Sequence, residues 1–543
     1  MKLFFKIIVL MFICMLCSEH AYAQNWAKTY GTSDWEVGSA ISATADGGFY
    51  VAGTAEFDNN GYDIVVLRLD ALGNVIWQKY YGGKDYDHAS SIIALPDGGC
   101  LVAGSYDNYS SYYDDMWVLR LDSMGNIRWQ RKYGGSSEDS VTSIAISTDG
   151  NFLVGGNTRS FGGGYDQNIL LLKLDQTGNV IWQKVYGGKN YDYLGSIIST
   201  PDGGFIIAAS SESFSNGWNS NIWIVKSDSN GNIQWQETLG GSNSDYGYDV
   251  KATPDGGYIL TGVTYSWSSE WKPRLWIIKF NSIGVIEWQK LYKAGDYLPN
   301  AFIYPSGDGG YIILTNLGYY PEDILIVKLD HSGAIQWAKT YGSIYDDSAA
   351  ALTGTSDGGF AVAGTTYSYG AGASDMWILK LDQQGDIGND CSLTKPYRLP
   401  KESVTDKPTR TNAWIGNISV TMTSTSEKPV DSQCVSTMEC GSGASFWITC
   451  NPSSLPYLLR ISTCSVNSFL DFSSIVYMSC SDLPEGASCL FSPDSISPMP
   501  GTSVTTLLSV KLNSKIPKGT YPFKVIGTNG NTIRTYLMQF KVN

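Results

Sequence analysis

Short apolar segments alternate with glycine-containing turns along residues 25–387. One turn reads Asp-Gly-Gly or Asp-Gly-Asn, and an apolar segment lies on each side of every copy, as at residues 91–94 and 205–208. Asp-Gly between two apolar segments predicts a tight hairpin, because glycine readily adopts the positive φ that the turn needs. Successive copies are 49 to 53 residues apart, and the seven copies begin at Asp46, Asp97, Asp149, Asp202, Asp255, Asp308 and Asp357.

A second turn, with glycine three residues after Asp or Asn, occurs once in every repeat. A strand-like segment precedes it, as at residues 116–121, and another follows it, as at residues 179–184. Each repeat therefore predicts four short strands, and this strand number and period are typical of a β-propeller blade. The sequence predicts an all-β fold with a seven-bladed β-propeller over residues 24–387. The second turns begin at Asp70, Asp122, Asp175, Asp228, Asn281, Asp330 and Asp382.

The fourth strand of the repeat carries a tryptophan. Each turn occurs seven times, but this tryptophan occurs only six times after the turns. The internal copies are Trp77, Trp129, Trp182, Trp235, Trp288 and Trp337. The missing copy lies at the other end of the domain, where residues 25–31 nearly repeat residues 336–342. We therefore expect the first mature strand to complete the last blade, which removes the exposed edges of an open array.

The repeat DGGF-x-VAG…LKLD-x-x-G-x-I-x-WQK-x-YGG resembles repeats of secreted bacterial and archaeal propeller proteins. It is also distantly similar to kelch propellers and to the tryptophan motif of quinoprotein propellers, although its Asp-to-Gly interval is one residue shorter than in the quinoprotein motif. The resemblance covers residues 25–387 and implies the fold far more than a function.

The C-terminal part of the chain differs in composition. Residues 388–436 are rich in Ser, Thr, Pro and Lys and predict an extended linker. We expect Cys391 and Cys434, which bracket this linker, to form a disulfide; the alternative is that both stay unpaired. Residues 437–543 alternate apolar and polar positions and resemble bacterial immunoglobulin-like modules at residues 479–489 and 518–521. That resemblance implies an Ig-like β-sandwich with a Cys480–Cys489 bridge.

The remaining cysteines receive separate interpretations. Cys450–Cys464 is a plausible second bridge of the sandwich, since clustered cysteines in an exported protein usually form disulfides. Cys440 has no assigned partner. Cys100 occupies a position where other repeats carry Phe or Tyr, so we expect a buried free thiol there.

The N-terminus and the charge limit the compartment and the partners. Lys2 and Lys6, an apolar run over residues 3–17 and the small residues of 21–23 predict a signal peptide over residues 1–23, with a retained membrane anchor as the alternative. We expect a secreted, cell-surface or periplasmic monomer without a later membrane span. The formal net charge of −14 disfavours nucleic acid.

The two faces of a propeller should differ in this chain. Both glycine turns must lie on one face, and the loops between strands two and three lie on the other face with the connections between blades. These loops are rich in Tyr, Trp, Ser, Asn and Gly, a mixture that suits binding, including binding of sugar rings. Aromatic residues that recur once per repeat indicate packing, so the ligand-binding candidates are the irregular ones, Tyr112, Tyr113, Trp218 and Trp271.

An acidic residue also recurs just before the innermost strand, near the expected channel mouth. Oxygen ligands suit Ca²⁺, so a cation site is one interpretation. The other is that each carboxylate accepts hydrogen bonds and locks neighbouring blades, which the regular recurrence favours. Leu298 interrupts the series, whose members are Glu36, Asp87, Asp139, Asp192, Asp245 and Asp347.

The leading functional hypothesis is an extracellular, non-enzymatic binding or scaffold protein for a glycan, peptide or surface partner. The alternatives are a secreted propeller enzyme, either a glycoside hydrolase or lyase or a quinoprotein-like enzyme, and a structural component of the cell envelope. No catalytic residue stands out, and the mature chain contains only His88 and His331, which disfavours histidine-based metal sites and catalytic triads.

Overall fold

The computed structural model describes most of the chain after residue 24, so the expected signal peptide lies outside the described residues. All regular secondary structure in the described part is β, and none of it is a helix that is long and apolar enough to cross a membrane. The described residues are 25–56, 61–82, 86–106, 114–161, 166–215, 219–267, 271–318, 321–370, 373–387, 394–396, 401–402, 409–410, 414–417, 421–423, 446–451, 454–455, 461–468, 475–484, 486–498, 503–512, 516–529 and 532–542.

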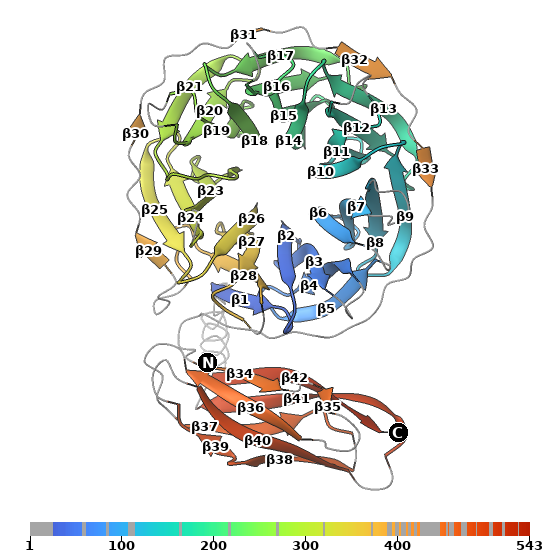
Figure 1. The fold of residues 1–543 in the computed structure, drawn as a ribbon, viewed down its shortest axis with the longest axis vertical. Coiled ribbons are helices and arrows are strands. Elements are labelled where there is room, and N and C mark those ends of the chain that lie inside the picture. The colour runs from blue at the N-terminus through green and yellow to red at the C-terminus, as the bar shows by residue number, and fades with distance from the viewer. Residues whose placement is uncertain are drawn as a thin grey trace, which may run out of the picture.

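Seven antiparallel sheets of the described chain follow one another around a closed, propeller-like ring (Figure 1). We number them one to seven in chain order; in each, the strand named first lies innermost. The first four are β2 (Glu36–Ala43), β3 (Phe49–Glu56), β4 (Tyr62–Leu69) and β5 (Val75–Tyr81); β6 (Asp87–Ala94), β7 (Cys100–Tyr106), β8 (Asp115–Leu121) and β9 (Ile127–Gly134); β10 (Asp139–Ile146), β11 (Phe152–Thr158), β12 (Asn168–Leu174) and β13 (Val180–Gly187); and β14 (Asp192–Ser199), β15 (Phe205–Ser211), β16 (Asn221–Ser227) and β17 (Ile233–Leu239).

The seventh sheet takes its outermost strand from the N-terminus. β1 pairs antiparallel with β28, from Trp26 opposite Lys380 to Tyr30 opposite Met376. The two ends of the ring are thereby joined within one sheet. Sheets five to seven are β18 (Asp245–Ala252), β19 (Tyr258–Thr264), β20 (Arg274–Phe280) and β21 (Ile286–Tyr292); β22 (Phe302–Pro305), β23 (Tyr311–Leu317), β24 (Asp323–Leu329) and β25 (Ile335–Tyr341); and β26 (Asp347–Gly354), β27 (Phe360–Thr366), β28 (Asp375–Leu381) and β1 (Trp26–Tyr30).

In six of the seven sheets, the outermost strand carries a tryptophan and a tyrosine, and the tyrosine hydroxyl donates to a glycine carbonyl of the next sheet; sheet four has Leu239 in place of the tyrosine. At the joint between sheets seven and one, Trp26 Nε1 donates to the Ala71 carbonyl at 3.2 Å and the Tyr30 hydroxyl donates to the Gly73 carbonyl at 2.7 Å. Gly73 has a φ of 75°, and a Cβ there would lie 2.8 Å from the Trp26 ring. The repeated Trp, Tyr and turn glycine therefore form one packing unit between sheets.

The segment expected as a linker contains five short strands that run backward around the ring. Each adds a fifth, outer antiparallel strand to one sheet, beginning at sheet six and ending at sheet two (Figure 1). Pairing of this kind covers the outer edge of a sheet. We call these strands the belt; they are β29 (Thr394–Pro396), β30 (Lys401–Glu402), β31 (Thr409–Arg410), β32 (Trp414–Asn417) and β33 (Thr421–Thr423). Cys391 and Cys434 lie outside the described residues.

The C-terminal unit consists of two sheets that share one apolar core. Val466 and Leu508 of one sheet pack with Phe523 and Phe540 of the other, and all four are buried. The first sheet has the order β34-β36-β40-β38 and the second the order β35-β42-β41-β37-β39. The strands are β34 (Phe446–Asn451), β35 (Ser454–Leu455), β36 (Ile461–Ser468), β37 (Val476–Ser481), β38 (Ala487–Ser492), β39 (Ser495–Ile496), β40 (Ser503–Leu512), β41 (Gly519–Asn529) and β42 (Thr532–Val542).

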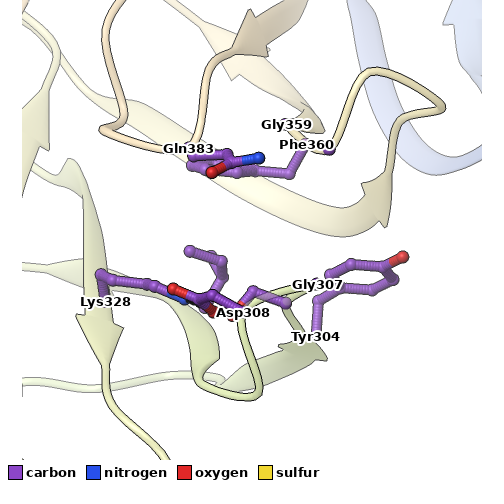
Figure 2. Close-up of a pocket in the computed structure, with 10 residues that line it drawn as sticks. Tyr304, Gly307, Asp308, Lys328, Gly359, Phe360 and Gln383 are labelled. Carbon is purple, nitrogen blue, oxygen red and sulfur yellow. Dashed lines mark hydrogen bonds and ion pairs between the residues drawn. The ribbon is translucent and has the colours of Figure 1, made fainter.

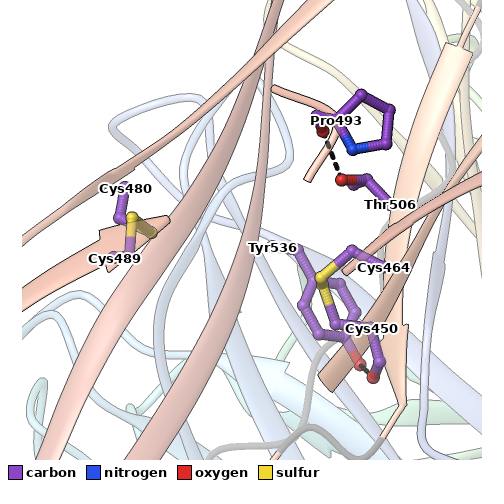
Figure 3. The surroundings of a disulfide bond; sticks show 7 residues. All are labelled: Cys450, Cys464, Cys480, Cys489, Pro493, Thr506 and Tyr536. Atoms are coloured by element: carbon purple, nitrogen blue, oxygen red, sulfur yellow. Dashed lines mark hydrogen bonds between the residues drawn. A yellow bond between two sulfur atoms is a disulfide. The ribbon is translucent and has the colours of Figure 1, made fainter. Parts of the chain in front are cut away.

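Two disulfides stabilise this unit, and both have the expected pairing (Figure 3). Cys450–Cys464 joins directly opposed residues of β34 and β36 within one sheet. Cys480–Cys489 joins β37 to β38 and so links the two sheets. Cys440 lies outside the described residues. Cys100 is a buried free thiol, and burial raises its pKa far above the usual range, so it stays protonated and unreactive.

Candidate functional site

One face of the ring carries both glycine turns of every sheet and repeats a single ion pair. The Asp of the Asp-Gly turn accepts from a buried Lys or Arg on the third strand; Asp202 Oδ2, for example, lies 2.8 Å from Lys226 Nζ. The pair recurs in all seven sheets. Partial burial opposes ionisation of Asp202, but hydrogen bonds from Lys226 and Thr200 lower its pKa to about 2. We call this surface the turn face, and its regularity indicates a structural role.

The pocket on the turn face belongs to the same pattern. It lies between sheets six and seven and is lined by Tyr304, Asp308, Lys328, Phe360 and Gln383 (Figure 2). Lys328 Nζ is 2.6 Å from Asp308 Oδ1, so the cation of the pocket is engaged by the repeated ion pair. The pocket is a crevice between sheets rather than a distinct chemical site.

The opposite face, which we call the loop face, contains the acidic series. Each of the six residues begins an innermost strand, and each is at most 2% exposed. Asp192 is representative, since its Oδ2 accepts from Gly188 N at 2.8 Å and from the Ser213 hydroxyl at 2.6 Å. Its backbone N–H donates to the Gln167 carbonyl of the preceding sheet.

These contacts give the acidic series a structural task. Asp192 ties the connection between sheets three and four to the loop that follows strand two, and Asp139 and Asp245 make the corresponding bonds. Five of the six carboxylates accept a hydrogen bond within their own joint; they are Glu36, Asp139, Asp192, Asp245 and Asp347. No group of three or more His, Cys, Asp or Glu side chains among the described residues could hold a metal ion.

Several joints bring a second carboxyl group close to the first. At the joint between sheets seven and one, a Cβ on Gly31 would lie 2.2 Å from Asp375 Oδ1 and 2.7 Å from Glu36 Oε2. Burial raises the pKa of Glu36 to about 7, against the lowering hydrogen bonds from Thr32 and with a further rise from the charge of Asp375. Burial and the charge of Asp139 likewise raise the pKa of Asp115 to about 6.

Of the four aromatic residues predicted to bind a ligand, one lies among the described residues. Tyr112, Tyr113 and Trp218 lie outside the described residues. Trp271 is 74% exposed with a φ of 56°, so it projects from the loop before β20. The regularly recurring aromatics behave differently: Phe214 and Trp267 pack against the buried Trp223 and Trp276.

Further aromatic residues flank the acidic series, and they are not among the candidates predicted from the sequence. Because side chains alternate along a strand, the neighbours of a buried acid point the other way. Trp35, Tyr86 and Tyr193, for example, are 43%, 44% and 36% exposed. The residues directly before members of the series include Trp35, Tyr86 and Tyr191, and those directly after include His88, Tyr193 and Tyr246; Tyr297 precedes Leu298, which interrupts the series. This alternation was a usable signal in the sequence.

These aromatics form groups on the loop face. On one side, Tyr62 lies 5.5 Å from Tyr86 and 6.2 Å from His88 between ring centroids. Trp35 meets Tyr367 edge to face at 5.7 Å, across the joint of sheets one and seven.

The largest group, which we call the tyrosine cluster, spans sheets four and five and the connection to sheet six. Tyr191 and Tyr193 stack with their centroids 6.0 Å apart and their planes 7° apart. Tyr246 meets Tyr265 edge to face at 6.4 Å. Burial raises the pKa of Tyr265, and the nearby phenols of Tyr246 and Tyr297 add to this rise. The cluster consists of Tyr191, Tyr193, Tyr246, Tyr265 and Tyr297.

Comparisons with known proteins give partial similarities. The chain matches no family model. Over 174 residues it is 25% identical to the regulatory protein FlaEY of Caulobacter vibrioides, a match that covers 28% of this chain and 18% of FlaEY. The chain thus spans about a fifth of the length of that protein.

Solved structures share the β-rich architecture at low similarity. A protein of unknown function from Dyadobacter fermentans is 11% identical with a TM-score of 0.37, over 54% of this chain and 94% of that one. Puromycin hydrolase is 10% identical with a TM-score of 0.30, over 62% of this chain and 58% of that one. These values assign no family to the chain.

Proposed function

We propose that the ring is a seven-bladed β-propeller closed by its N-terminal strand, and that the C-terminal unit is an Ig-like sandwich. Seven repeated sequence units, each matching one sheet of the ring, support the first statement. Two packed sheets with a shared core support the second. The signal-like N-terminus and the two disulfides support export to the cell surface, the periplasm or the medium.

We further propose that the protein is an extracellular, non-enzymatic binding or scaffold protein whose loop face takes a glycan, peptide or surface partner. The observation that carries this proposal is the contrast between the faces. The turn face repeats one ion pair seven times, whereas the loop face exposes unevenly distributed Trp, Tyr and His side chains around the inner strands. Rigid aromatic side chains supply contact area at a low entropic cost.

The paired carboxyl groups of the joints do not favour an enzyme. A glycosidase needs an acid and a base that reach the sugar, whereas Glu36, Asp87 and Asp139 are at most 2% exposed. Glu36 accepts a hydrogen bond from Thr32, and Asp139 accepts from Gly135 and Ser160, so these two have structural roles.

A glycan and protein array probed with the labelled mature chain tests the binding proposal. We expect hits that weaken in a Trp35→Ala/Tyr86→Ala variant and persist in an Asp175→Asn variant, since Asp175 lies on the turn face. Hits lost equally in both variants, or no hits on either array, would contradict a loop-face site.

A further inference from the structure

The tyrosine cluster has a composition that selects among ligands. Its rings are accompanied by charged side chains: Glu212 and Arg159 lie near Tyr193, and Asp296 directly precedes Tyr297. Burial raises the pKa of Glu212, and the neighbouring carboxylates of Asp192 and Asp166 add to this rise. Asp296 is paired with Lys272 at 2.9 Å, and Arg159 lies 3.4 Å from Glu138. A polyanionic ligand would therefore meet repulsion here.

The polar groups beneath the cluster hold the tyrosine-bearing segments in place. The Glu212 backbone N–H donates to the Tyr191 carbonyl at 2.8 Å, and the Tyr265 N–H donates to the Ser244 carbonyl at 3.0 Å. Asn243 Nδ2 donates to the Tyr265 carbonyl at 3.1 Å. The rings thus stand on strand starts and short bonded turns, so little conformational entropy is lost when a ligand binds.

The arrangement of the rings indicates an extended ligand. The parallel pair Tyr191 and Tyr193 comes from sheet four, Tyr246 and Tyr265 come from sheet five, and Tyr297 precedes the inner strand of sheet six. These rings therefore follow one another over three neighbouring sheets. A single small molecule would use only part of such an arc.

We propose that the tyrosine cluster binds a neutral polysaccharide chain, with successive sugar rings lying against successive tyrosines. The C–H-bearing face of a sugar is weakly positive and apolar, which suits the electron-rich face of an aromatic ring. The phenol hydroxyls and the carboxylates of Glu212 and Asp296 accept hydrogen bonds from sugar hydroxyls. This inference rests on the proposed loop-face function and adds the position and the ligand class.

Affinity electrophoresis of the mature chain in gels containing neutral polysaccharides tests the proposal. The probes are mixed-linkage β-glucan, xylan and galactomannan, with alginate and polygalacturonate as acidic counterparts. We expect retardation by at least one neutral polymer and none by the acidic polymers. A Tyr193→Ala/Tyr246→Ala variant should bind that polymer about tenfold more weakly or worse. The matched control is Tyr345→Ala, an exposed loop-face tyrosine of sheet seven outside the cluster.

The outcomes separate this inference from the broader proposal. Equal thermal unfolding temperatures of the three proteins would assign the loss to the site rather than to folding. Array binding could be weakened by Trp35→Ala/Tyr86→Ala but unchanged by Tyr193→Ala/Tyr246→Ala. This result would contradict a ligand site at the tyrosine cluster but would still support binding on the loop face. Retardation only by acidic polymers would overturn the ligand class, and no binding to any array or polymer would overturn both proposals.

Discussion

Glu36 and Asp375 meet at the joint where the ring closes, and Glu36 is 2% exposed. A folded-state pKa of about 7, above the usual glutamate value of 4.5, means that the folded protein binds the proton more tightly than the unfolded chain. Stability contributed by this proton is fully present below about pH 4.5 and is lost as the pH rises through 7.

Glu36→Gln should remove this pH dependence. The amide oxygen can still accept from the Thr32 hydroxyl, which lies 2.6 Å from Glu36 Oε1, and the variant carries no charge beside Asp375. At pH 8 we expect its free energy of unfolding to exceed that of the wild type by on the order of 2 kcal/mol. At pH 4.5 the two proteins should differ little. Urea titrations at the two pH values measure this difference, and a variant destabilised equally at both would contradict the interpretation.

Asp202 illustrates the opposite sign on the turn face. Its folded-state pKa of about 2 lies below the usual aspartate value of 3.8, so its stabilisation is present above pH 4 and is lost as the pH falls through 2. Asp202→Asn should cost about 1 kcal/mol at pH 7, because the carboxylate is half exposed and its attraction to Lys226 is screened. The urea midpoint at pH 7 checks this value, and a neutral result would show that the turn alone explains the aspartate.

Strand β1 is the element on which closure depends. Its removal would leave β28 without an outer partner and remove the Trp26 and Tyr30 bonds to sheet one. A chain lacking residues 25–31 should unfold at a temperature many degrees lower or fail to fold. Thermal unfolding followed by circular dichroism measures the effect, and an unchanged midpoint would show that the ring does not need this strand.

The belt permits a matched test at the same scale. A chain ending at residue 436 keeps β29 to β33 and loses the sandwich, whereas a chain ending at residue 393 loses both. We expect the shorter chain to unfold at a lower temperature and to aggregate more, because five sheet edges lose their partners. Identical behaviour of the two chains would mean that the belt adds no stability.

The elements also show what a sequence can predict. The strand positions of the ring follow from turn glycines and apolar alternation, since both are local signals. The belt was not predicted, because its pairing uses backbone groups and the Ser, Thr and Pro-rich segment carries no periodic side-chain pattern. Tyr193, which is 36% exposed, and the half-buried Tyr246 were not predicted as site residues, although strand alternation next to Asp192 and Asp245 indicated them. Trp271 was predicted as a ligand-binding residue, and its side chain is exposed. The contacts of the tyrosine cluster depend on neighbouring sheets that no local pattern specifies.

At the scale of the molecule, the two faces of the ring differ in the residues that they present. The turn face repeats its ion pairs and turns around the circle, while the loop face combines a buried, structural acidic series with exposed aromatics that differ from sheet to sheet. The repeated ion pairs and turns stabilise the ring, and the exposed aromatics are the proposed contacts for a partner. The central claim is that binding occurs on the loop face.

The most direct test is to map the bound face by hydrogen–deuterium exchange with the best-retained polysaccharide or array ligand. We predict that protection appears at the starts of the inner strands, around Tyr193, Tyr246 and Tyr297, and not at the turns around Asp202 and Asp255. Protection confined to the turn face or to the sandwich would contradict the account.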